Sequence, residues 1–178
     1  PYNCRNIHFF DIHKRYGDDD INSRLYFSWP KFFSTSSTLY HLSFRVDMNC
    51  SKLELKPLSA TSNLEALYIR GRHYPKSPIP DFFINGTTKE LQLMSIRDWR
   101  FSNTLTNARF SNTSGLVVID ISNTQLAGFI PSSIFDMPCL RVLDLSLNQL
   151  SGTLPNVTRK RMKKIRCMDL HGNKENLK

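Results

Sequence analysis

One segment of the sequence recurs 24 residues later in the same chain, and this repetition constrains the fold more than any other feature. Residues 116–131 read LVVIDISNTQLAGFIP, and residues 140–155 read LRVLDLSLNQLSGTLP. Six pairs of residues correspond at an offset of 24: Leu116 and Leu140, Ile119 and Leu143, Ile121 and Leu145, Leu126 and Leu150, Gly128 and Gly152, and Pro131 and Pro155. A repeat of this length is typical of a solenoid, in which each unit stacks on its neighbours because one unit alone cannot bury its apolar edge.

The apolar spacing of this segment, L-x-x-L-x-L, also occurs elsewhere in the chain. Units begin near residues 39, 64, 91, 116, 140 and 165, at intervals of 24 to 27 residues. We therefore expect residues 39–178 to form one repeat domain. Residues 1–38 fit the spacing only in fragments and are expected to form irregular N-terminal repeats or an insertion.

The last two apolar residues of each unit lie two positions apart, which is the period of a β-strand. Leu143 and Leu145 should therefore face inward, and Asp144 and Ser146 should face outward. The side-chain amide of Asn148 can bond backbone groups of neighbouring coils. The predicted fold is an α/β solenoid with a parallel β-sheet on its concave face and an irregular or 3-10 convex side.

The segment LDLSLNQLSGTLP at 143–155 resembles the plant-type leucine-rich repeat, L-x-x-N-x-L-S-G-x-I-P. The preceding unit matches the same motif, with Thr124 at the Asn position and Ala127 at the Ser position. The resemblance implies a non-enzymatic recognition module of a plant receptor-like protein or receptor-like kinase in defence or developmental signalling. Its ligand would be a protein, peptide or acidic glycan on the concave surface, with a co-receptor as a further partner.

The same resemblance implies a location on the extracellular face of the plasma membrane or in the cell wall. Because the chain begins at Pro1 and not at Met, we expect a processed chain or a fragment. No apolar run is long enough to cross a membrane, so a membrane would be reached only through segments absent from this chain.

Two other classes of protein share parts of the pattern. Residues 62–71 and 79–91 resemble the irregular repeats of cytosolic plant nucleotide-binding immune receptors, which would place the chain in the cytoplasm. The regular repeat also resembles that of polygalacturonase-inhibiting proteins, which implies an enzyme inhibitor. A signal peptide and membrane span in the full reading frame would favour the receptor, and an upstream Walker-type loop would favour the immune receptor.

Charge and motif content narrow the function classes further. The chain has 24 Lys and Arg against 15 Asp and Glu, but six of the basic residues lie within 159–166. We therefore expect no nucleic-acid partner. No phosphate-binding loop, hydrolase motif or zinc-protease motif occurs, so we expect no enzyme activity, cofactor or metal site. The four cysteines permit two disulfides without requiring them; they are Cys4, Cys50, Cys139 and Cys167.

Four sequons for N-glycosylation give weak support for a secreted protein. The candidate glycan acceptors are Asn49, Asn85, Asn112 and Asn156. The last three fall between predicted strands, where a glycan can be accommodated.

The candidate ligand-binding residues come from the concave face. The residue after the second strand position is arginine in three successive units and a small or neutral residue in the next three: Arg45, Arg70 and Arg97, then Ser122, Ser146 and His171. Since the repeat pattern does not require arginine here, we expect this arginine column (Arg45, Arg70 and Arg97) to face an anionic ligand. Tyr68, Asp120 and Asp144 complete the candidate set, although regularly spaced aspartates also belong to the repeat pattern itself.

Overall fold

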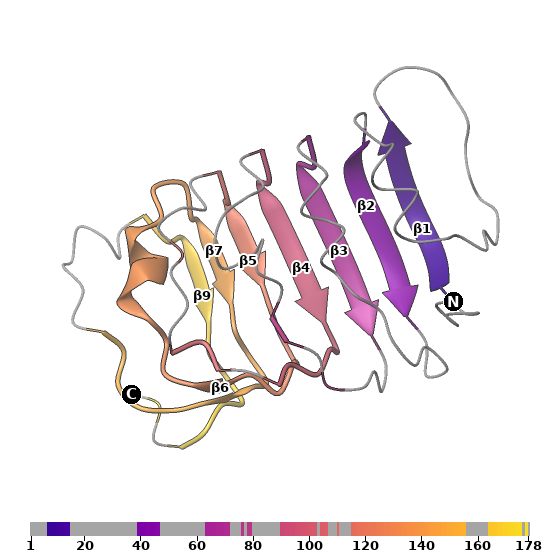
Figure 1. Cartoon of the computed structure of the whole chain (residues 1–178). Coiled ribbons are helices and arrows are strands. Elements are labelled where there is room, and N and C mark those ends of the chain that lie inside the picture. Colours follow the sequence, from indigo (N-terminus) through magenta and orange to yellow (C-terminus); the bar gives the residue numbers. More distant parts are fainter. Residues whose placement is uncertain are drawn as a thin grey trace.

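The computed structural model describes residues 7–14, 39–46, 63–71, 76, 78–79, 90–102, 104–106, 110, 115–155, 164–175 and 177. Seven strands form one sheet in the order of the chain (Figure 1). They are β1 (Ile7–Lys14), β2 (Leu39–Val46), β3 (Ala66–Gly71), β4 (Leu93–Arg97), β5 (Val118–Asp120), β7 (Val142–Asp144) and β9 (Cys167–Asp169). Neighbouring strands from β2 to β9 are parallel, whereas β1 runs antiparallel to β2.

The return side of the coils carries little regular structure. A second, two-stranded parallel sheet joins β6 (Ala127–Gly128) to β8 (Gln149–Leu150). A 3-10 turn, η3 (Ser132–Asp136), precedes β7. The predicted solenoid, with one parallel sheet and an irregular or 3-10 opposite side, is confirmed.

The core is built from the two alternate apolar residues of each strand. From β2 to β7 these residues are at most 2% exposed: Leu42, Phe44, Leu67, Ile69, Met94, Ile96, Ile119, Ile121, Leu143 and Leu145. In the last coil the equivalent residues, Met168 and Leu170, are only partly buried. Because Leu143 and Leu145 are both fully buried, the inward direction predicted for them is confirmed.

The two residues predicted to face outward differ in their exposure. Asp144 is half-buried on the outer face of the sheet, but Ser146 is only 3% exposed. Both the backbone N–H and the hydroxyl of Ser146 donate to Oδ1 of Asp144, at 2.9 and 2.6 Å. These two bonds hold the short side chain against the sheet, where little solvent reaches it.

Asparagine side chains connect the coils, as the sequence predicts for Asn148. The amide of Asn148 donates to the carbonyl of Ile121 at 2.6 Å, and its oxygen accepts from the backbone of Thr124 at 3.0 Å. Asn173 repeats this role one coil later, through the carbonyl of Leu145 at 2.9 Å. Because each bond crosses between coils, these side chains fix the stacking distance as well as the turn.

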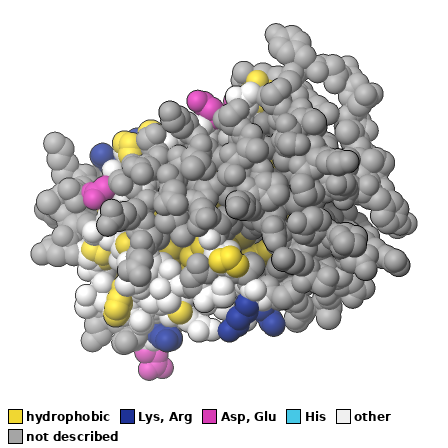
Figure 2. Space-filling model, in the orientation of Figure 1, with side chains coloured by type: hydrophobic (Ala, Val, Ile, Leu, Met, Phe, Trp, Pro, Cys, Tyr) yellow, Lys and Arg dark blue, Asp and Glu magenta, His cyan; other side chains and the backbone are white. Residues whose placement is uncertain are grey.

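The described surface shows a simple division of side chains from the side drawn in Figure 2. Hydrophobic side chains, surrounded by backbone and other side chains drawn in white, occupy the middle of the described part of this face, and the charged side chains lie around its edges. Within the described part of the chain, no helix has the length and apolar character needed to span a membrane.

Candidate functional site

A cavity of about 470 Å³ lies on the sheet over β2, β3, β4 and β5. Its lining includes five of the six candidate ligand-binding residues: Arg45, Tyr68, Arg70, Arg97 and Asp120. The remaining lining residues are Ser43, Phe44, Ile69, Leu93, Ser95 and Val118. Asp144 is the candidate that lies outside this cavity.

The strand register explains why the three arginines meet. Arg45 is the register partner of Arg70, and Arg70 is the register partner of Arg97. Parallel strands lie about 4.8 Å apart, so residues in register form a column across the sheet. Tyr68 occupies the neighbouring column between Ser43 and Ser95 and is 42% exposed.

The sequence alone suggests that the arginine column is a set of three solvated charges. The structure shows instead that two of the three arginines are ion-paired. Nε of Arg70 donates to Oδ2 of Asp98 at 2.6 Å. Nε and Nη2 of Arg97 both contact Oδ2 of Asp120. Two of the three guanidinium groups are thus ion-paired with a carboxylate from the next part of the solenoid, which removes much of the mutual repulsion.

Asp98 is a site residue that the sequence reasoning missed. Its carboxylate bonds Arg70 through one oxygen and accepts from Nδ2 of Asn123 at 2.8 Å through the other. Asp98 has a φ of 55°, and the equivalent residues Asn123, Leu147 and Gly172 have φ values of 54°, 55° and 66°. Asp, Asn and Gly tolerate this left-handed region better than other residues, so the recurrence of these residue types at positions 98, 123 and 172 was a usable signal.

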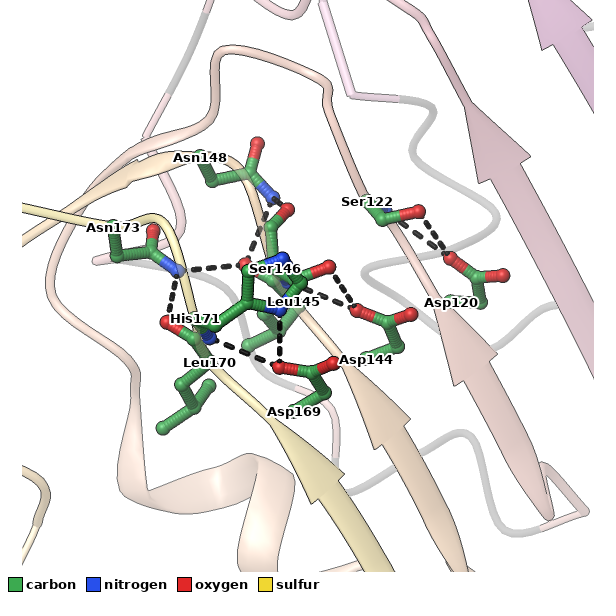
Figure 3. A network of polar contacts seen from close by, with 10 residues as sticks. All are labelled: Asp120, Ser122, Asp144, Leu145, Ser146, Asn148, Asp169, Leu170, His171 and Asn173. Carbon is green, nitrogen blue, oxygen red and sulfur yellow. Dashed lines mark hydrogen bonds and ion pairs between the residues drawn. The ribbon is translucent and has the colours of Figure 1, made fainter.

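The regular aspartates have a local structural role, which Figure 3 shows for three successive strands. In β5, Oδ1 of Asp120 accepts from the hydroxyl of Ser122 at 2.8 Å. In β7, Asp144 bonds Ser146 in the same way. Of the three aspartates in Figure 3, only Asp120 also lines the cavity. There its second oxygen accepts hydrogen bonds from Ser95 at 3.1 Å and from Arg97.

In β9 the same arrangement uses histidine in place of serine. Oδ1 of Asp169 accepts from the backbone N–H of His171 at 3.0 Å and contacts Nδ1 of its ring at 2.7 Å. The backbone bond, together with the ring contact, lowers the pKa of the Asp169 carboxyl below its ordinary value of 3.8. Protonating this carboxyl therefore requires a lower pH than in the unfolded chain.

Some sequence predictions fall on residues outside the described part of the chain. All four candidate glycan acceptors, Asn49, Asn85, Asn112 and Asn156, lie there. Cys4 and Cys50 also lie there. Cys139 and Cys167 are described, and both are free thiols.

Comparison with known proteins identifies the repeat. The family model described as "Leucine Rich Repeat" matches residues 115–137 and 139–160, which are the two units that repeat at an offset of 24. These two units are leucine-rich repeats. The matched residues include Asp120, Asp144 and Asn148, whose bonds are described above.

Two curated relatives of the chain are plant protein kinases. It is 33% identical over 107 residues to the Serine/threonine-protein kinase BRI1-like 1 of Arabidopsis thaliana, which covers 58% of this chain and 9% of the kinase. It is 28% identical over 135 residues to the Leucine-rich repeat receptor-like serine/threonine-protein kinase RGI4 of the same plant, over 76% of this chain and 11% of the kinase. The chain thus spans about a tenth of the length of these relatives, which it matches only through their repeats.

Several solved structures share this fold. The plant peptide hormone receptor RGFR1 in complex with RGF2 aligns with a TM-score of 0.66 and 18% identity, over 81% of this chain and 22% of that one. The BIR3–SERK2 complex from Arabidopsis thaliana aligns with a TM-score of 0.58 and 20% identity, over 79% and 69%. PEPR1–AtPEP1 aligns with a TM-score of 0.59 and 24% identity, over 75% and 18%. At these identities the likeness establishes the fold.

Proposed function

We propose that this chain is a non-enzymatic recognition module, part of the ectodomain of a plant receptor-like protein or receptor-like kinase. Its ligand is a peptide, or an extended segment of a protein, that binds in the cavity over β2–β5. The observation that carries the proposal is this cavity, which combines an exposed tyrosine, half-buried apolar side chains and arginines in one place. A few directional polar groups in an otherwise apolar hollow are the usual composition of a binding site.

The comparisons support a peptide over other ligands. One of the structures that share the fold, RGFR1, is called a plant peptide hormone receptor and is in complex with RGF2, and a second structure joins PEPR1 to AtPEP1. The receptor-like kinases among the relatives support a position on the extracellular face of the plasma membrane. Expression through the secretory pathway, followed by glycosidase treatment and mass spectrometry, tests this position. Glycans on Asn85, Asn112 or Asn156 would agree with it.

A displayed library of random heptapeptides, selected on the immobilised chain, tests the binding function. Bound peptides should be re-tested on two variants of similar chemistry, Tyr68→Ser inside the cavity and Phe129→Ser outside it. Phe129 is the matched control because it is also an exposed aromatic residue, at 54% against 42% for Tyr68. We expect selected peptides to keep their affinity for Phe129→Ser and to lose about tenfold or more on Tyr68→Ser, since a buried aromatic contact contributes roughly 1–3 kcal/mol. The proposal fails if no peptide is enriched, or if the two variants bind the enriched peptides equally well.

A further inference from the structure

The arginine column is much less positive than its three side chains suggest, and this limits the charge of the ligand. Arg70 contacts Asp98 at 2.6 Å, and Arg97 is ion-paired with Asp120. These two arginines therefore add almost no net charge to the cavity. Arg45 adds at most one positive charge, whatever it contacts. The cavity offers at most one net positive charge to a ligand, not three.

The two paired arginines differ in the donors that they leave for a ligand. Arg70 uses only Nε on Asp98, and its two terminal nitrogens make no bond within the described residues. Its side chain is 51% exposed. Arg97 already uses both Nε and Nη2 on Asp120. A planar guanidinium that is held from one side can bind a carboxylate with its remaining N–H groups, so Arg70 is the better anchor.

The other residues that line the cavity make additional negative charges on the ligand unfavourable. Leu93 and Val118 are half-buried in the column beside Tyr68 and Ser95, and they offer no hydrogen-bond donor. A second or third anionic group on the ligand would lie against these side chains or close to Asp98 and Asp120. Burying an unpaired charge there is unfavourable, and a nearby carboxylate of the same sign adds repulsion.

We infer that the cavity selects a peptide with a single acidic side chain, whose carboxylate binds Arg70, flanked by apolar residues that lie over Leu93, Val118 and Tyr68. Asp98 is the positioning residue that orients Arg70, and together with Asp120 it excludes polyanions such as acidic oligosaccharides. This inference rests on the proposed function, because it specifies the ligand of the same cavity.

The heptapeptide selection tests the inference separately from the function. The random segment is joined to carrier sequence at both ends, so its carboxylates come only from side chains. Among peptides that depend on Tyr68, we expect one acidic residue per heptapeptide, and a loss of affinity of about tenfold on Arg70→Gln, the size of one charge-assisted hydrogen-bonded contact. Arg166→Gln is the matched control, because Arg166 is exposed and lies outside the cavity. Tyr68-dependent peptides with no acidic residue, or with two or more, would overturn the inference and leave the proposed function standing.

A second comparison tests the role of Asp98. One selected peptide is synthesised with its single acidic residue and again with two neighbouring residues changed to Glu. The wild-type chain should bind the single-acid peptide about tenfold more tightly, and Asp98→Asn should reduce this preference to about threefold or less, because it removes one repelling carboxylate. Glu175→Gln, which removes an exposed carboxylate at the other end of the solenoid, should leave the preference unchanged. The inference is wrong if the wild-type chain prefers the triple-acid peptide, or if Asp98→Asn and Glu175→Gln behave alike. Thermal unfolding of each variant checks that the fold is kept.

Discussion

The side-chain oxygen of Asn148 lies 3.0 Å from the backbone nitrogen of Leu126, which belongs to the preceding coil. The same oxygen accepts from the backbone and the hydroxyl of Thr124, and the amide nitrogen donates to the carbonyls of Ile121 and Leu145. Asn148 is only 7% exposed. A single buried side chain therefore bonds backbone groups of two neighbouring coils.

Replacing Asn148 with Leu should strongly destabilise the chain. The change leaves the N–H groups of Thr124 and Leu126 buried without acceptors, and each such group costs about 1–3 kcal/mol. We expect the free energy of unfolding to fall by about 3–5 kcal/mol, measured by chemical denaturation. Asn173→Leu is the matched control in the last coil, where the bonds are only part-buried, and it should cost clearly less. Equal losses would show that burial does not set the strength of these bonds.

The alternation of β7 predicts unequal effects of two adjacent substitutions. Leu143 is fully buried, whereas Asp144 is half-buried on the outer face. Leu143→Ala should cost about 2–5 kcal/mol through lost burial and the cavity left behind. Asp144→Ala should cost less than half as much, since it removes only the local bonds to Ser146. Similar losses in denaturant titrations would contradict the register of this strand.

Replacing Leu147 with asparagine should stabilise the folded chain. It has a φ of 55° and is 49% exposed, and the left-handed region costs a residue with a Cβ roughly 1–2 kcal/mol. Asn123 holds the same position one coil earlier and bonds Asp98. Leu147→Asn should therefore raise the free energy of unfolding by about 0.5–1 kcal/mol, because Asn is among the residues best suited to this region.

The reciprocal change, Asn123→Leu, serves as the control for this prediction. It should lower the free energy of unfolding, because it places Leu at a φ of 54° and removes the bond to Asp98. If both substitutions shift the stability in the same direction, backbone conformation does not govern this position.

The contact between Asp169 and His171 gives a pH dependence with a defined sign. The pKa of Asp169 is lowered in the folded chain from its ordinary value of 3.8. The contact therefore stabilises the fold fully above about pH 4, and this contribution is lost as the pH falls through the lowered pKa. Nuclear magnetic resonance titration of the carboxyl carbon should give a midpoint below 3.8. His171→Ala should restore the pKa only partly, because the backbone N–H of residue 171 has the largest effect and remains. A wild-type midpoint at or above 3.8 would contradict this account.

The 24-residue repeat predicts the parallel strands, because each unit must place its strand beside the strand of the preceding unit. The alternation of Leu143, Asp144 and Leu145 then determines which side chains enter the core. The direction of β1 could not be predicted in this way. The fragments Ile7, Phe10 and Ile12 fit the apolar spacing, but alternate residues share a face whichever way a strand runs, and β1 is antiparallel.

The sequence was sufficient to predict that the three arginines align in a column, but not that carboxylates neutralise two of them. Register alone brings Arg45, Arg70 and Arg97 together, since they occupy equivalent positions in successive units. The pairing of Arg70 with Asp98 depends on the left-handed turn at residue 98, which directs the carboxylate back toward the sheet. Apolar spacing contains no information about such a turn, so the sequence overstated the positive charge of the cavity.

Photo-crosslinking from within the cavity tests the central claim, that ligand binds over β2–β5, most directly. Benzoylphenylalanine replaces either Tyr68, which lines the cavity, or Phe129, which follows β6 outside it; both natural side chains are exposed aromatics. The chain is irradiated with a selected heptapeptide and the adducts are measured by mass spectrometry. The account predicts a covalent adduct from position 68, suppressed by excess unlabelled peptide, and only background from position 129. An adduct from position 129 without one from position 68 would contradict it.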